Sequence, residues 1–165
     1  MKTLIAAAVV LLGTTALQAQ DHANCPMMSA HAKRDGVDRR HDAVTGVRHE
    51  HAVHHFLLAP TGGTIRLETA GAGAEDARER IREHLQVITK SFAEGDFAIP
   101  MLIHDEVPPG VADMKKMKGA IQYAFAPTDK GGEVRISTKD PAALAAVHAF
   151  LHYQIEDHGT GDPTE

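Results

Sequence analysis

The sequence FLLAPTGGTIRLET at residues 56–69 recurs, with two inserted residues, as YAFAPTDKGGEVRIST at residues 123–138. Each copy reads as a strand, a glycine-rich turn and a second strand, which is the pattern of a β-hairpin. The repeat therefore predicts two hairpins and four strands.

A helical pattern follows each hairpin. The first covers about residues 74–93, and the second opens at Asp140-Pro141, an N-cap followed by a proline at the first helical position. Both helices are predicted to stop at a Gly-Asp pair, at 95–96 and 161–162. Each carries one apolar stripe, formed by Ala77, Ile81, Leu85, Ile88 and Phe92 on the first and by Leu144, Val147, Leu151 and Ile155 on the second.

These elements predict an α+β fold, a tandem ββα repeat that forms a four-stranded, mainly antiparallel sheet with two helices on one face. Repeat one covers residues 51–97, a proline-rich connection covers 98–119, and repeat two covers 120–162, so that 51–162 is a single domain. The open edges and bare second face of such a sheet leave room for a homodimer.

The first nineteen residues have the pattern of a signal peptide. Lys2 precedes an apolar run from Leu4 to Leu12, and small residues up to Ala19 suit signal-peptidase cleavage. The run is too short to span a bilayer. We therefore expect a soluble periplasmic or secreted protein without stable membrane insertion. Residues 20–50 would form a polar arm outside the domain.

Composition narrows the class of ligand. Seventeen Lys and Arg against 22 Asp and Glu give a formal net charge of −5, which argues against a nucleic-acid partner. Of the 12 histidines, five fall between His41 and His55, and Cys25 is the sole cysteine. Imidazole, thiolate and thioether are the donors that hold late transition metals, so the composition predicts a metal-ion ligand.

Cys25-Pro26-Met27 resembles the opening of the Cys-Pro-Met-His-Pro motif in heavy-metal-binding domains of copper-exporting systems. Met28 and Ser29 stand where that motif has His and Pro, and the resemblance does not extend into the main domain. It implies soft-metal handling by the arm. The candidate ligands there are Cys25, Met27, Met28 and His31.

The repeat predicts a second group of ligands inside the domain. It aligns His54 with Ile121, which the alternation of apolar residues turns toward the helices. His84 and His148 lie on or beside the helical stripes, so these three imidazoles are expected to converge. His104 and His152 would complete a coordination set. The alternative is that each is a hydrogen-bonded core residue.

Three functions follow from these patterns. The first is a periplasmic metal-binding protein for copper buffering, transfer or sensing, with zinc or haem as other cofactors that histidines accommodate. The second is a metal-dependent enzyme with a histidine-ligated site. The third is a non-catalytic dimerising or partner-binding domain with structural histidines. No nucleophile elbow, phosphate loop or Cys-x-x-Cys is present, so no catalytic residue is assigned.

Overall fold

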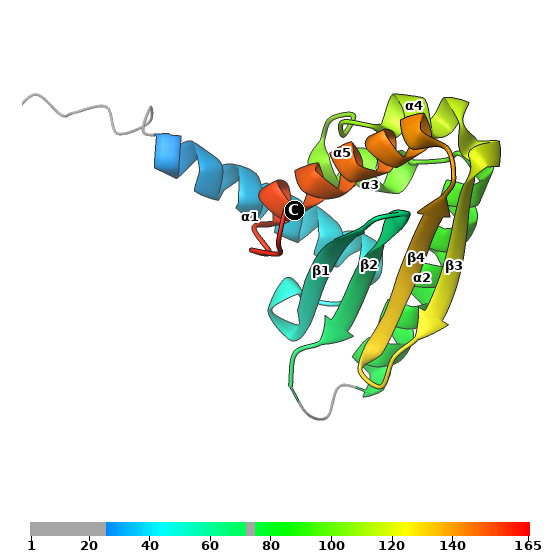
Figure 1. Ribbon diagram of the computed structural model, residues 1–165. Coiled ribbons are helices and arrows are strands. Elements are labelled where there is room, and N and C mark those ends of the chain that lie inside the picture. Colours follow the sequence, from blue (N-terminus) through cyan, green and yellow to red (C-terminus); the bar gives the residue numbers. More distant parts are fainter. Residues whose placement is uncertain (1–25, 72–74) are drawn as a thin grey trace, which may run out of the picture.

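The protein is described here by a computed structural model that covers residues 26–71 and 75–165, with side chains from residue 31 onward. Its centre is a four-stranded antiparallel sheet with strand order β1-β2-β4-β3 (Figure 1). The strands are β1 (Ala52–Ala59), β2 (Gly62–Thr69), β3 (Ile121–Pro127) and β4 (Gly131–Thr138). The predicted α+β class and the two hairpins are confirmed.

Helices α2 (Glu75–Glu94) and α5 (Pro141–His158) cover one face of this sheet. Each helix packs mainly on the hairpin of the other repeat, α2 on β3 and β4 and α5 on β1 and β2. The Asp140 side chain caps α5 as predicted, by accepting hydrogen bonds from the backbone of Ala142 and Ala143. The predicted stop at Gly161 is wrong, because Gly159 already adopts the left-handed conformation that ends the helix, with φ 61°.

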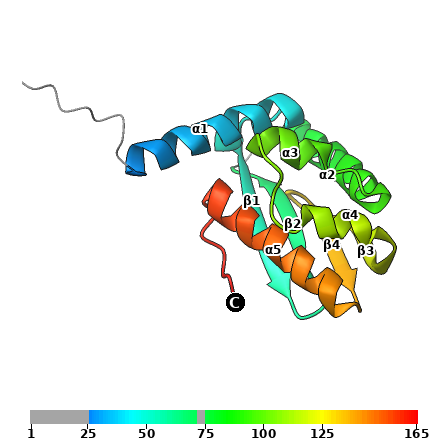
Figure 2. The same ribbon diagram turned by 90° about the horizontal axis from the view of Figure 1, so that it is seen from above.

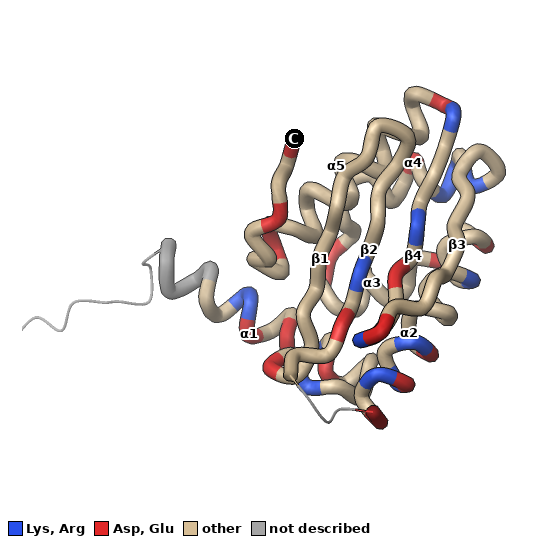
Figure 3. The backbone as a smooth tube through the Cα atoms, turned by 60° about the horizontal axis from the view of Figure 1, so that its bottom comes forward, with Lys and Arg blue, Asp and Glu red and all other residues tan. Residues whose placement is uncertain are grey.

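The two faces of the sheet differ in chemistry. Phe56 and Ile65, which pair across β1 and β2, are buried beneath the helices, and Val134 continues this row on β4. On the opposite face, Arg66 and Arg135 both bind the carboxylate of Glu133, at 2.7 and 2.6 Å. Figure 3 looks onto this charged face, with the helices behind it.

Residues 98–119 are more than a connection. They form α3 (Ala98–His104), α4 (Val111–Lys116) and most of the 3-10 turn η3 (Lys118–Ala120). Ile103 and His104 at the end of α3, and Val111 and Met114 in α4, are buried. This segment therefore adds to the core and brings a histidine into it.

The prediction of a polar arm outside the domain is wrong for its second half. Residues Pro26–Thr45 form α1, whose first half projects from the body (Figures 1 and 2) while its second half packs on α3 and α5. Val37, His41 and Thr45, spaced four apart, are buried there. Val37 is the only aliphatic residue of these three, so the sequence of α1 shows almost no apolar periodicity. A 3-10 turn, η2 (His49–His51), joins α1 to β1.

The C-terminal segment closes part of the edge of the sheet. Asp162 accepts a hydrogen bond of 2.8 Å from the backbone N–H of Phe56 and lies 2.8 Å from Nδ1 of His55. Because β1 is an edge strand, this carboxylate occupies a backbone donor that would otherwise be open. Across 26–71 and 75–165, no helix has the length and apolar character needed to cross a membrane. The predicted signal peptide lies outside these residues.

A candidate metal site in a histidine cavity

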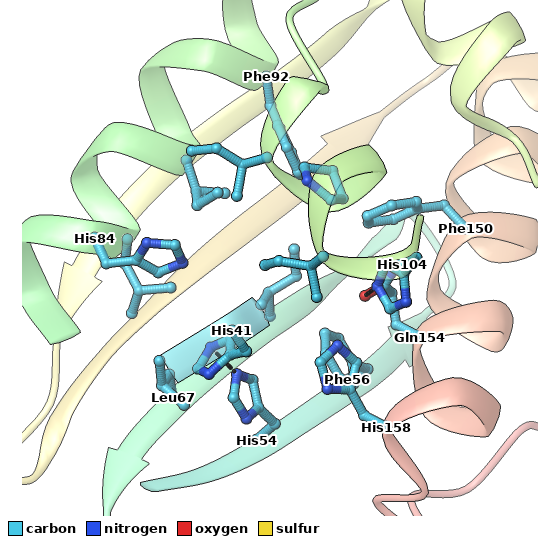
Figure 4. A pocket seen from close by; sticks show the side chains of 16 residues that line it. His41, His54, Phe56, Leu67, His84, Phe92, His104, Phe150, Gln154 and His158 are labelled. Atoms are coloured by element: carbon cyan, nitrogen blue, oxygen red, sulfur yellow. Dashed lines mark hydrogen bonds between the residues drawn. The ribbon is translucent and has the colours of Figure 1, made fainter. Parts of the chain in front are cut away.

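Six elements line a cavity of about 50 Å³ between the sheet and the helices, which we call the histidine cavity (Figure 4). Five of them contribute one histidine each: His41 from α1, His54 from β1, His84 from α2, His104 from α3 and His158 from α5. Apolar side chains and one amide, Gln154, form the rest of the wall. The apolar residues are Phe56, Ile65, Leu67, Leu85, Ile88, Phe92, Ile99, Pro100, Ile103 and Phe150.

The closest pair of imidazoles is His41 and His54. Their Nε2 atoms are 2.9 Å apart, so that one ring donates a hydrogen bond to the other (Figure 4). The ring of His158 stacks beside His54 at 5.0 Å between centroids and lies 6.2 Å from the ring of His41. His84 approaches from the other side, 6.1 Å from His41. His41 therefore has three imidazole neighbours.

The second ring nitrogen of His41, Nδ1, is buried and has no hydrogen-bond partner. A neutral imidazole has one donor and one acceptor nitrogen, and the bond to His54 uses only one of them. A buried polar atom without a partner costs roughly 1–3 kcal/mol. The hydrogen bonding of the His41 ring is therefore incomplete.

Burial keeps four of these imidazoles neutral. It lowers the pKa of His41 and of His84 to about 4 and that of His158 to about 3. The pKa of His54 is also well below its ordinary value, first because of burial and then because the other histidines surround it. At pH 7 each of these rings is neutral and has one nitrogen with a lone pair, which is the state in which imidazole binds a metal ion.

The other end of the cavity is fixed by a hydrogen-bonded chain. Nδ1 of His104 donates to Asp157 Oδ2 at 2.5 Å, and Lys33 binds the second oxygen of that carboxylate at 2.6 Å. Burial acts to raise the pKa of Asp157, but hydrogen bonds from Lys33 and His104 bring it below its ordinary value. Nε2 of His104 contacts Oε1 of Gln154 at 2.9 Å. The ring of His104 is thus held at both nitrogens.

A surface groove leads toward the cavity between α1 and α2. Val44 and Thr45 line it from α1, and Arg80, Glu83 and Val87 line it from α2. His84 and Ile99 line both the groove and the histidine cavity. His84 therefore borders both the surface groove and the histidine cavity.

The structure brings together three of the predicted ligands, His54, His84 and His104, and separates the others from them. Nε2 of His148 lies 3.0 Å from the carbonyl oxygens of both Ala59 and Gly62, so this nitrogen donates its hydrogen to the β1–β2 turn, and His148 is not among the residues that line the cavity. The convergence predicted for His148 is wrong. His152 does not line the cavity either.

The predicted sulfur site is only partly within the described residues. Cys25 lies outside them, and Met27 and Met28 belong to the first turn of α1, where side chains are not described. His31 is exposed on the projecting part of α1. A copper(I) site in this segment stays a prediction.

Two histidines of the cavity, His41 and His158, were not among the predicted ligands. His158 follows Val147, Leu151 and Gln154 at helical spacing on α5, a signal that an analysis of apolar residues alone passes over. His41 had the weaker signal, since only its four-residue spacing from Val37 and Thr45 marks the buried side of α1.

Among the described side chains, no three His, Cys, Asp or Glu residues are already arranged as a metal site. The imidazoles of the cavity therefore lie near one another without forming a metal site. Comparison of the chain with family models, curated proteins and solved structures gave no match. The class that fold and cavity define is an α+β protein with a cluster of buried and half-buried imidazoles.

Proposed function

We propose that this chain is an exported metal-binding protein that holds copper in the histidine cavity for buffering, transfer or sensing. The observation that carries the proposal is the meeting of four neutral imidazoles, with Nε2 of His41 and Nε2 of His54 only 2.9 Å apart. The pattern of residues 1–19 supports export, and the absence of a catalytic motif favours binding over turnover.

The distance between the Nε2 atoms of His41 and His54 allows both nitrogens to bind one metal ion after small rotations of the rings. With metal–nitrogen bonds of about 2.1 Å, two ligand nitrogens are about 3.0 Å apart at a right angle and about 3.4 Å apart at a tetrahedral angle. The 2.9 Å between the Nε2 atoms of His41 and His54 corresponds to the first case. An ion bound between them replaces their mutual hydrogen bond, and His158 or His84 supplies the third nitrogen.

The chemistry of the donors favours copper. An imidazole set binds copper(II) more tightly than zinc in the usual order of stabilities, and sulfur donors of the predicted arm suit copper(I). Both oxidation states therefore have suitable ligands in one chain. Zinc remains an alternative for the imidazole site alone. A porphyrin is far larger than a cavity of about 50 Å³, so the cavity does not support haem binding.

The test is metal stoichiometry and affinity for the full chain, purified without a histidine tag and titrated with copper(II) against a competing chelator. We expect one tightly bound copper per chain at pH 7. Loss of residues that merely orient a ligand typically costs 10–100-fold in affinity, so His41→Leu and His54→Leu should each weaken binding by at least about 100-fold.

The matched control is His148→Leu, which removes a half-buried histidine outside the cavity. It should lower the melting temperature of the apoprotein while leaving copper affinity unchanged. Unchanged copper affinity in both His41→Leu and His54→Leu would show that these histidines are structural, and would leave the predicted Cys25 segment as the remaining candidate.

A further inference from the structure

The amide of Gln154, like the ring of His41, has one polar atom without a hydrogen-bond partner. Its Oε1 contacts His104, while its Nε2 is buried without a hydrogen-bond partner, and the side chain as a whole is only 4 % exposed. Because Oε1 can only accept, His104 donates to it from Nε2 in this orientation, and the N–H group of the amide is the end left without a partner. Gln154 and His41 line one cavity.

The size of the cavity allows a small molecule. About 10–15 Å³ suffices for one water molecule, and the histidine cavity measures about 50 Å³. Its wall is apolar apart from the histidines and Gln154, so a guest has few polar partners to choose from. A ligand of two or three heavy atoms would fill the space.

The charge of a bound metal ion also favours an anion in the cavity. No carboxylate is among the residues that line the cavity in the described chain, and the four candidate imidazoles are neutral ligands. Asp157, which binds His104 from behind, is already paired with Lys33. A copper(II) ion held in this way has no compensating charge, and an uncompensated buried charge is costly.

We infer that the histidine cavity binds a small monovalent anion of two or three heavy atoms, which completes the coordination of the metal and accepts a hydrogen bond from Gln154. This inference rests on the metal site proposed above. His104 is a positioning residue in it, because it holds the oxygen end of the amide. The groove between α1 and α2, with Arg80 on its wall, provides the entry route.

Azide is a suitable probe, since it is a linear monovalent anion of three atoms and gives a charge-transfer absorption band when it binds copper(II). The full chain, loaded with one copper(II) and checked for stoichiometry, is titrated with azide at pH 7. We expect a saturable band with one azide per copper. Gln154→Met should weaken azide binding about tenfold, because the hydrogen bond is lost while the volume is kept.

Gln154→Glu provides a second variant that keeps an oxygen toward His104 and places negative charge near the anion, and it should weaken azide binding more than Gln154→Met. Gln86→Met, at an exposed position of α2, is the matched control and should leave azide affinity unchanged. Copper stoichiometry should equal that of the wild type in all three variants.

The outcomes separate the two proposals. If the chain takes up no copper, both fail. If it binds copper but gives no azide band, water or hydroxide alone completes the site and the anion proposal is overturned. If wild type, Gln154→Met and Gln154→Glu bind azide with equal affinity, the cavity does not use Gln154 and the proposal is overturned as well.

Discussion

A histidine in this protein takes its role from the partners of its two ring nitrogens. His148 donates to two carbonyl oxygens and stabilises a turn, and His104 is held between Asp157 and Gln154. His55 lies against Asp162 at the edge of the sheet. His41 differs from all of these, because one of its nitrogens faces another imidazole and the other has no partner. Unused nitrogens, rather than the number of histidines, mark the candidate site.

The buried histidines make the stability of the apoprotein depend on pH. The pKa of His41 and of His84 is about 4 in the folded protein, against about 6.5 in the unfolded chain. As the pH falls from about 6.5 toward 4, the unfolded chain takes up protons that the folded protein excludes, so the free energy of unfolding falls. The contribution is fully present above pH 6.5, and for His41 it amounts to roughly 3 kcal/mol.

Urea unfolding of the metal-free protein at pH 7.5, 6 and 5 measures this effect. We expect the midpoint to fall steeply across the series, and His41→Leu to flatten the dependence by about one proton. Exposed His49, whose pKa is raised first by its hydrogen bond to Asp42, acts weakly in the opposite direction. A midpoint that stays constant between pH 7.5 and 5 would contradict the burial of these imidazoles.

At the scale of elements, α1 is a polar helix that docks through a few contacts. Val37 is fully buried, and the side chain of Arg40 donates a hydrogen bond of 2.5 Å to the backbone carbonyl of Ile103 at the end of α3. Lys33 adds the ion pair to Asp157. Docking of α1 and placement of His41 in the cavity therefore depend on the same short segment.

Val37→Ala tests this docking. Removing two buried methyl groups should lower the free energy of unfolding by about 1–3 kcal/mol, even though alanine is the better helix former. Arg39→Ala, at an exposed position of the same helix, is the control and should change it by less than about 0.5 kcal/mol. Chemical denaturation of both variants gives the comparison. Equal stability of Val37→Ala and wild type would show that α1 does not dock.

At the scale of the whole molecule, the two repeats are joined at the centre of the sheet, where β2 pairs with β4. A Gly-Gly pair opens both β2 and β4, and each pair lies opposite the other of these two strands. Gly131 of β4 pairs with Glu68, and Gly62 of β2 pairs with Ser137. A Cβ atom on Gly131 would lie 2.2 Å from the carbonyl oxygen of Leu67. These glycines therefore permit the close approach of the two halves.

Gly131→Ala should destabilise the protein by at least about 2 kcal/mol, because the new methyl group meets backbone atoms that cannot move without breaking the central ladder. Gly119→Ala, where no atom lies within 4 Å of the added Cβ, should be neutral. Thermal unfolding of the two variants measures the difference. A stable Gly131→Ala variant would mean that the β2–β4 pairing is looser than the structure has it.

The sequence by itself determined the local structure of the two repeats. The duplicated segment at 56–69 and 123–138 fixed the hairpins, Asp140-Pro141 fixed the start of α5, and alternation placed His54 on the covered face. Hairpins, caps and alternation are decided by neighbours a few residues away, so their signals are present in the chain. For the same reason, the buried residues of α2 all belong to its predicted apolar stripe, whereas the predicted stripe of α5 accounts for only part of its buried face.

Only the tertiary structure decided the site. His41, His54 and His158 come from elements separated by up to a hundred residues, and their meeting depends on the crossing of α5 over β1 and on the docking of α1. His148, six residues before Gln154 on the same helix, faces the β1–β2 turn instead of the cavity. Helical periodicity assigns a residue to a side of its helix, but which neighbour lies on that side is set by packing between distant elements, and no local pattern records it.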